Sequence, residues 1–289
     1  MGAIDNLRAD DALDVELVEK AQNGDQVALE ALIRRHQPWI LHIAQRMLWN
    51  RGDAEDATQE ILIKAITHLG DFRRRSKFRT WLYRIAANQL LDRSRAAKSF
   101  SQIARGLEEM PDGDLPDPKS TGVENRILVQ EAKIACTTGI LLCLKPRQRL
   151  VFILGEILGV TDDVGAAILD VSAGNFRQML SRTRRRLYRF LQRQCGLVNH
   201  SNPCRCANKT SGFIAKGWVQ PSRLQFVDAP LVQIGEAVPD RMRELTELER
   251  RHAQIFREQP LLAPRDEALA LRRLLQETGV RQTMGLEQL

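Results

Sequence analysis

Seven arginines and no acidic residue occupy the stretch from Arg177 to Arg193. Guanidinium groups along a helix can bond phosphates, and an arginine can also read guanine through two parallel hydrogen bonds. A solvated helix surface would normally alternate arginine with glutamate or aspartate one turn apart, and this stretch does not. The pattern therefore predicts a helix that binds nucleic acid.

A second basic block runs from Phe72 to Arg95, with eight basic residues against the single Asp92. Aromatic rings interrupt it at Phe72, Phe78, Trp81 and Tyr83. Taken singly, each ring is well explained as part of a hydrophobic core. Taken with the cations they predict a strand-binding surface, since cations can follow the backbone while rings accept unstacked bases. Asn88 can pair with a base edge.

Four soft metal ligands lie close together at Cys195, His200, Cys204 and Cys206. Four thiolate or imidazole ligands can build a closed tetrahedral zinc site. The Cys-x-Cys spacing is tighter than in common zinc motifs, so reduced thiols, or a redox-responsive pair at Cys204 and Cys206, remain alternatives. No constellation of catalytic acids and bases stands out, so we expect no enzyme and no required cofactor, with zinc as the one candidate.

The elements that must position these residues are predicted to be helices. Helical spacing of apolar residues dominates from Leu13 to Leu191, and alternating strand patterns are nearly absent, which predicts an all-α fold. Asp25 is expected to cap a long helix that Pro38 kinks, and Asp53 to cap the next one. A further helix should begin near Phe78.

The second half of the chain predicts a helix-turn-helix. Helical spacing resumes at Glu124, Pro146 can start the next helix, and Thr161–Gln194 reads as two helices joined at Asp170. Aspartate tolerates the left-handed conformation that this turn needs. Gly165 stands where the first helix usually carries an apolar anchor, so we expect softer packing there.

Residues 99–121 predict a flexible acidic linker, because they hold three prolines, two glycines and five acids against two basic residues. We therefore expect domains at 10–98 and 123–194, a linker at 99–122, and a partly helical extension at 195–289. In the extension, the sequence predicts a short extended piece at 226–239 and amphipathic helices with mixed charges at 241–258 and 265–276. Such helices suit partner contact, or docking on the preceding domains.

The totals limit the class of protein. A chain of 289 residues predicts about two domains, and a net charge of +7 favours polyanionic partners. The first residues lack the apolar core of an export signal, no apolar run is long enough to span a membrane, and the five cysteines are an odd number. These features predict a cytoplasmic protein with no membrane span.

Four segments together resemble a known family. They are Asp56–Ile61, Thr80–Asn88, Lys145–Arg149 and Leu180–Leu187, which resemble, in this order, the extracytoplasmic-function (group IV) sigma factors of bacterial RNA polymerase. The resemblance covers about residues 10–194. It implies a region 2-like bundle and a region 4-like helix-turn-helix, which bind core RNA polymerase and promoter DNA and read the minus-ten and minus-thirty-five elements.

The resemblance also implies roles for particular residues. Asp56, Gln59 and Glu60 would dock on the polymerase. The minus-ten element would be bound by Phe72, Arg73, Arg74, Lys77, Trp81, Arg84 and Asn88, with Phe72 in the loop that receives a flipped base. The minus-thirty-five element would be bound by Arg177, Gln178, Ser181, Arg182, Arg184 and Arg185, of which Arg184 and Arg185 would contact phosphates.

Two further questions stay open at this level. A stand-alone helix-turn-helix regulator of duplex operator DNA is the alternative function, although it has little use for the aromatic block at Phe72–Arg95. Control could come from a separate anti-sigma factor or from the extension itself.

Overall fold

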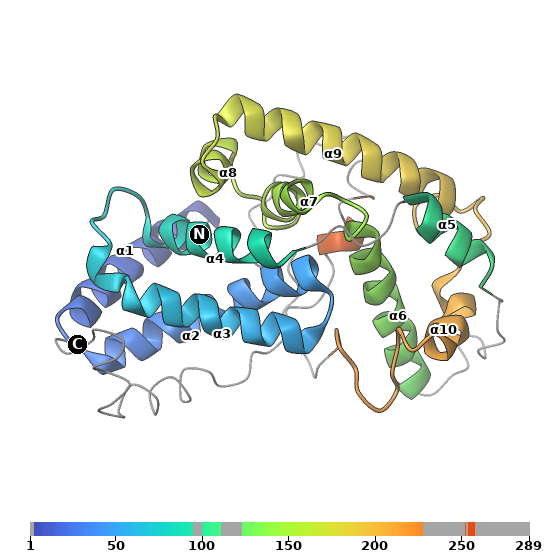
Figure 1. Cartoon of the computed structure of the whole chain (residues 1–289), viewed down its shortest axis with the longest axis horizontal. Coiled ribbons are helices and arrows are strands. Elements are labelled where there is room, and N and C mark those ends of the chain that lie inside the picture. The colour runs from blue at the N-terminus through green and yellow to red at the C-terminus, as the bar shows by residue number, and fades with distance from the viewer. Residues whose placement is uncertain (1–2, 95–99, 111–122, 228–251, 253, 258–289) are drawn as a thin grey trace.

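The computed structural model describes residues 3–94, 100–110, 123–227, 252 and 254–257. These residues form helices joined by turns and loops, with no strand among them (Figure 1), so the prediction of an all-α fold is confirmed. The helices gather in two groups along the chain. Segments of the C-terminal extension lie against both groups.

The first group contains α1 (Ala3–Gln22), α2 (Gln26–Leu48), α3 (Arg51–Thr67), the short 3-10 helix η1 (Leu69–Asp71) and α4 (Phe78–Arg93). Asp25 caps α2 as predicted, because its carboxylate accepts the N–H groups of Val27 and Ala28 at 2.9 and 3.0 Å. Pro38 lies inside α2, which continues past it. Apolar faces of these helices pack on one another.

The cap of α3 differs from the prediction. Asn50, not Asp53, is the cap: its side-chain oxygen accepts the N–H of Asp53 at 3.1 Å. Asp53 instead lies in the first turn of α3, where the positive end of the helix dipole stabilises its negative charge. Both residue types are good caps, so the sequence alone did not separate them.

The predicted linker begins with a helix, α5 (Phe100–Glu108). Leu107 and Met110 are buried against a small apolar cluster that includes Phe213 and Phe226 of the extension. The start of the predicted linker is therefore ordered by packing against residues that are far away in the sequence. Residues 111–122, which hold the three prolines, lie outside the described residues.

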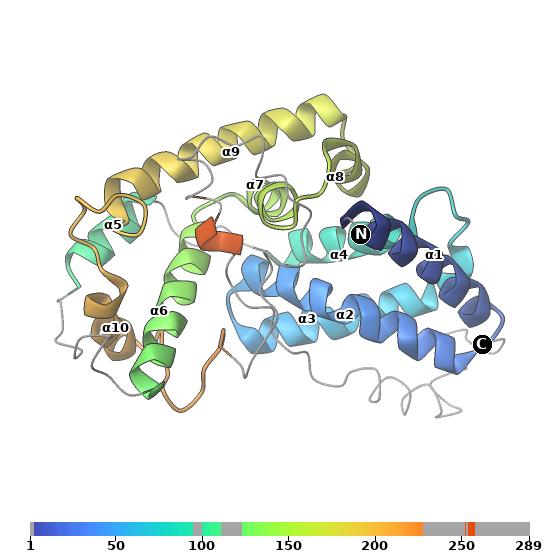
Figure 2. The same cartoon turned by 180° about the vertical axis from the view of Figure 1, so that it is seen from behind.

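The second group contains α6 (Val123–Leu141), α7 (Pro146–Phe152), the π-helix η2 (Ile153–Ile157), α8 (Asp162–Leu169) and α9 (Ala173–Gln194). Pro146 starts α7 as predicted. The segment that follows η2 turns at Gly159, whose φ of 64° is left-handed and easily adopted by glycine. The extension then adds α10 (Cys206–Ala215) beside α6, as Figure 2 shows from behind.

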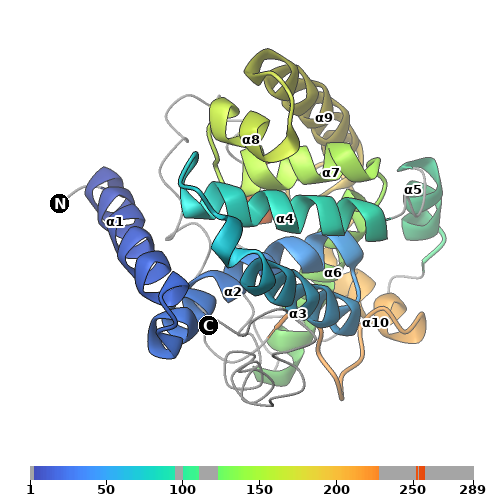
Figure 3. The same cartoon turned by 60° about the vertical axis from the view of Figure 1, so that its left-hand side comes forward.

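The two groups share one hydrophobic core, in which α4 packs against α7 and α8 (Figure 3). Arg149 of α7 is fully buried at this junction. Its guanidinium donates to the carbonyls of Leu141, Leu142 and Leu144 at 3.1–3.2 Å, and to that of Met47 in α2. Burial lowers the pKa of Arg149 to about 10, so it stays cationic at neutral pH. One buried charge thus ties the two groups together.

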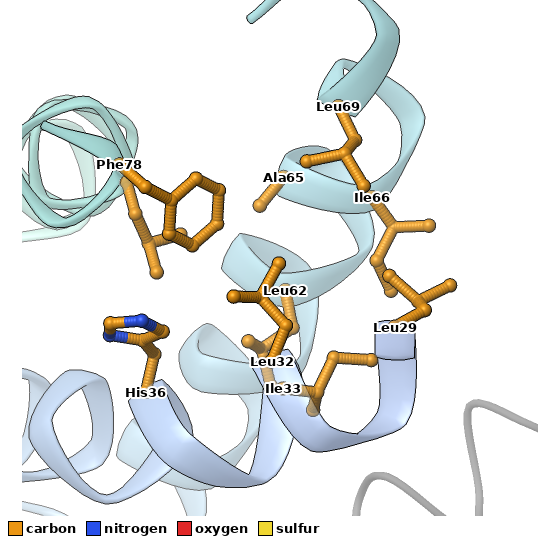
Figure 4. Close-up of a pocket in the computed structure, with 10 residues that line it drawn as sticks. Leu29, Leu32, Ile33, His36, Leu62, Ala65, Ile66, Leu69 and Phe78 are labelled. Atoms are coloured by element: carbon orange, nitrogen blue, oxygen red, sulfur yellow. The ribbon is translucent and has the colours of Figure 1, made fainter. Parts of the chain in front are cut away.

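A narrow gap of about 20 Å³ remains between α2, α3 and α4 (Figure 4). Aliphatic side chains and the Phe78 ring line it, and His36 is its one polar neighbour among the lining residues. The His36 ring meets Phe78 edge-on at 5.3 Å and bonds Asp14 at 3.1 Å. A gap of this size, without a converging polar set, is a packing defect and not a ligand site.

Of the helices predicted in the extension, only part of one lies among the described residues. His252 and residues 254–257 are helical and pack beside α7 and α9, where Phe256 meets Phe152 at 5.2 Å. The rest of 241–258, all of 265–276 and most of the predicted extended piece at 226–239 lie outside the described residues.

Candidate nucleic-acid and polymerase interfaces

The helix-turn-helix forms as the sequence predicts. Thr161 and Ser172 cap α8 and α9, each accepting a backbone N–H three residues on, from Val164 and Asn175 respectively. Asp170 adopts the left-handed conformation between the helices, with φ 53° and ψ 57°. An aspartate thus takes the place of the usual glycine in the turn.

Gly165 does not soften this domain in the way we expected. A Cβ atom at Gly165 would clash with the ring of Phe176, which is fully buried. The aromatic ring of α9 therefore fills the space that an anchor on α8 would take. The glycine is required by close packing between the two helices.

One side of α9 is buried and the other carries the predicted DNA-binding residues. Phe176, Leu180, Thr183, Leu187 and Leu191 face the core. The exposed residues of the predicted set are Arg177, Gln178, Ser181, Arg182 and Arg185. Arg177 forms an ion pair with Asp162 at 2.8 Å, but 69% of its side chain stays exposed.

Arg184 differs from its neighbours, because it pairs with Glu156 of η2. Glu156 is fully buried, and Arg257 of the extension donates to its backbone carbonyl at 2.7 Å. Burial, followed by the charge of Glu156, raises the pKa of the neighbouring Tyr188 well above its usual value. The side chain of Arg184 is thus committed to a buried acid in this structure.

The predicted minus-ten residues lie on α4 and on the loop before it. Arg73, Arg74, Lys77, Arg84 and Asn88 are exposed. Arg74 pairs with Glu19 at 2.5 Å, and Lys77 pairs with Asp11, both in α1. These ion pairs are at the surface, where they are worth little and can be exchanged for phosphates.

Phe72 is buried, so its ring face is not offered to solvent. It packs with Phe78 and Trp81 at ring distances of 5.3 to 5.6 Å. Trp81 is partly exposed and is therefore the accessible ring of this cluster. The sequence did not distinguish the two rings, because burial depends on how the loop folds back onto α4.

The predicted polymerase-binding residues lie on α3. Asp56 is exposed, Gln59 is half-buried, and Glu60 is exposed but engaged. Glu60 accepts a hydrogen bond from Gln89 at 2.9 Å and pairs with Arg93, both in α4. Asp56 is thus the carboxylate of the three that is most open to a partner.

The zinc site that the sequence left as one alternative is not assembled in the part of the chain that the structure describes. Among the described residues, no group of three or more His, Cys, Asp and Glu side chains could hold a metal ion. Hydrogen bonds shape the loop instead: Asn202 donates to the carbonyl of Cys195 at 3.2 Å, and Arg205 to that of His200 at 2.8 Å. The His200 side chain is left exposed.

The thiols nevertheless gather around a residue that sequence reasoning missed. Cys136 of α6 interacts electrostatically with Cys195, Cys204 and Cys206, and its own burial raises its thiol pKa well above the usual value. All five cysteines are free thiols. No local motif marks Cys136, which is brought to the others by the packing of α10 on α6.

Comparison with known proteins agrees with these features. The model of sigma-70 region 2 matches residues 32–100. The RNA polymerase sigma-H factor of Pseudomonas aeruginosa is 31% identical over 185 residues, which is 62% of this chain and 94% of that protein. The ECF RNA polymerase sigma-E factor of Escherichia coli is 34% identical over 176 residues, or 59% and 90% of the two chains.

A solved structure, CnrH in complex with the cytosolic domain of CnrY, aligns with 62% of this chain and 97% of its own, at 24% identity and a TM-score of 0.46. None of the helices in the described part of the chain has the length and apolarity to cross a membrane. On its match to nearly the full length of curated relatives, the chain belongs to the extracytoplasmic-function group of the sigma-70 family of RNA polymerase sigma factors.

Proposed function

We propose that this sigma factor binds core RNA polymerase and reads two promoter elements: the minus-ten element with residues 10–98 and the minus-thirty-five element with residues 123–194. The observation that carries the proposal is the surface of α9. This helix follows the turn at Asp170 and presents five exposed residues that can bond DNA. No cofactor is needed for such binding. The place of action is the cytoplasm, where core polymerase and promoter DNA meet.

For the minus-thirty-five element, the exposed start of α9 enters the major groove. Arg177 and Gln178 lie in its first turns, where a recognition helix contacts base edges, and arginine suits guanine as glutamine suits adenine. Ser181 and Arg182 lie one turn later. Arg185 and Arg184 serve phosphates, and Arg184 reaches them only by leaving Glu156.

For the minus-ten element, α4 and its preceding loop supply the contacts. Arg74 and Lys77 bind phosphates after exchanging their partners in α1, and the exposed Arg73 binds beside them. Trp81 offers the partly exposed ring on which a base can stack. The Phe72 ring packs against that ring at 5.3 Å. Arg84 and Asn88 supply hydrogen bonds to the strand. Asp56, Gln59 and Glu60 form the polymerase-binding face on α3.

A stand-alone regulator of duplex DNA is not favoured. Its helix-turn-helix would explain α9 but would leave the cationic and aromatic surface around α4 without a use. The relatives that match most of their own length are sigma factors.

The test is transcription by bacterial core polymerase reconstituted with the full chain, assayed on a library of genomic fragments. Arg177→Ala and Arg185→Ala form a matched pair, since both arginines are exposed on α9 and neither is in the core. Arg177→Ala should relax base preference at one upstream position and cost about 1–3 kcal/mol on the preferred base. Arg185→Ala should weaken binding on all fragments and flatten its salt dependence.

Two results would count against the proposal. Equal effects of the two variants on every fragment would contradict the division of α9 into base and phosphate contacts. Binding to duplex fragments without polymerase, together with no transcripts, would favour the stand-alone regulator.

A further inference from the structure

The proposed minus-ten surface touches the helix-turn-helix in this structure. Arg84 on α4 donates to the carbonyl of Ala167 on α8 at 2.5 Å, and α8 packs against α4 (Figure 3). A promoter strand that bonds the Arg84 guanidinium must displace it from the Ala167 carbonyl. The helix that holds Arg84 is the first helix of the helix-turn-helix itself.

This contact cannot persist on a promoter. Elements centred near minus ten and minus thirty-five are about 25 base pairs apart, or about 85 Å at 3.4 Å per base pair. Two helical groups that pack on one shared core cannot reach both elements together. If the proposed function holds, the chain must therefore open between α4 and α8 before it reads DNA.

The extension bridges the same two helical groups. The buried carboxylate of Glu131 on α6 accepts the N–H groups of Gln225, Phe226 and Val227 at 2.6 to 3.2 Å. On the other side, Gln45 of α2 donates to the carbonyl of Gln225 at 2.6 Å. The Phe226 ring meets Trp49, the residue that ends α2, at 5.6 Å.

These contacts depend on one another. Burial raises the pKa of Glu131, and the bonds from three consecutive amides oppose that rise. Burying a charged carboxylate without hydrogen-bond donors costs free energy. If residues 225–227 detached, Glu131 would have to stay buried without these donors or move into water. The segment is held like a strap between α6 and α2.

Two further sets of contacts join the extension to the rest of the chain. Lys209 of α10 donates to the carbonyl of Met110, after α5, at 2.6 Å. Arg257 bonds the backbone of Glu156 at 2.7 Å, and the ring of His252 stacks on Tyr188 of α9 at 4.4 Å. The extension thus contacts the first group, the linker and the helix-turn-helix.

We propose that residues 225–227 form a latch on Glu131 that holds this sigma factor closed, with Arg84 bonded to α8 and the two promoter-reading groups packed on one core, so that the chain carries its own inhibitory element. Core polymerase or promoter DNA competes with the latch. This inference rests on the proposed function, because only promoter reading makes the closed form inactive.

The test compares Glu131→Gln with Glu108→Gln in the full chain. Both remove one carboxylate, but Glu108 is exposed on α5, and the amides of residues 225–227 bond Glu131 instead. Glu131→Gln removes the charge that the three amides bond, so the equilibrium between the closed and open forms should shift about tenfold toward the open form. The apparent affinity for core polymerase should then be about tenfold higher than in wild type. Small-angle scattering of the unbound Glu131→Gln chain should show a larger radius of gyration, while Glu108→Gln matches wild type.

A second variant guards against misfolding. Gln45→Met keeps the volume of α2 but removes the bond to Gln225, and it should shift both readouts in the same direction. Unchanged scattering and unchanged polymerase binding in both folded variants would overturn the latch. Failure of wild type and all variants to bind polymerase would instead overturn the proposed function, so the two failures are distinct.

Discussion

Arg149 offers the sharpest test of how the two helical groups are joined. Its guanidinium is fully buried and bonds four backbone carbonyls, three at the turn between α6 and α7 and one, that of Met47, at the end of α2. Arg149→Met keeps most of the apolar stem and removes all the donors. The carbonyls then have no protein donor in place of the guanidinium.

The size of the effect follows from these bonds. Removing the charged partner of a buried network costs about 3–5 kcal/mol, since each carbonyl left without its donor costs about 1–3 kcal/mol and relaxation recovers part of the sum. For a chain of this size that corresponds to a drop in melting temperature of roughly 6–20 °C. Arg149→Lys should lie between, because one ammonium group cannot reach all four carbonyls.

The assay is urea unfolding of the full chain followed by circular dichroism, with thermal melts alongside. Arg147→Met is the matched control: Arg147 is exposed and makes one bond, to the carbonyl of Leu169 at 3.0 Å, so its loss should cost at most about 1 kcal/mol. A wild-type-like stability for Arg149→Met would refute the role given to this buried charge.

Three further predictions concern packing, titration and thiol reactivity. Gly165→Ala should destabilise the helix-turn-helix by about 1–3 kcal/mol in urea melts, because the new methyl group meets the Phe176 ring. Gly174→Ala has open space at its Cβ atom and should be neutral or stabilising. The reverse order of stabilities would contradict the packing account. Burial lowers the pKa of His42 well below its usual value, so the unfolded chain binds the extra proton, and stability should fall as pH drops below about 6.5 by up to about 1.4 kcal/mol per pH unit. Melts of His42→Gln from pH 7.5 to 5.5 should lose that component, and an unchanged slope would reject it. Burial raises the pKa of the Cys206 thiol to about 12, so alkylation of Cys206 by iodoacetamide at pH 8 should be roughly a thousandfold slower than that of an ordinary thiol. Mass-spectrometric mapping measures this rate. Rapid labelling of Cys206 in the folded chain would contradict the raised pKa.

Much of the local structure could be predicted from the sequence, because it is decided by neighbours along the chain. Asp25 before α2, Pro146 at the start of α7 and Asp170 in the turn all act within a few residues. The two basic segments were also visible, since charge and ring content need no tertiary information. Local signals therefore gave the all-α class and the helix-turn-helix.

The long-range features could not be predicted in the same way. Phe72 and Trp81 have similar sequence surroundings, yet one ring is buried and the other partly exposed. Arg184 looks like any other arginine of α9 until η2 brings the buried Glu156 beside it. Such outcomes depend on which helices meet, and a single sequence carries little information about that.

The extension shows the same limit most clearly. Four soft ligands at Cys195, His200, Cys204 and Cys206 left zinc as one alternative beside reduced thiols, whereas packing brings Cys136 of α6 to the thiols and leaves His200 exposed. Nothing local to Glu131 indicates that it accepts three amides from residues 225–227. The contacts that tie the extension to the helical groups join residues about a hundred positions apart in the sequence, as between Phe226 and Glu131.

The most direct measurement of the central claim is to mix the purified full chain with bacterial core RNA polymerase and sequence the run-off transcripts from a genomic fragment library. The account predicts a stable complex and transcripts whose start sites share two upstream elements. A chain that neither associates with core polymerase nor changes its transcripts would contradict it.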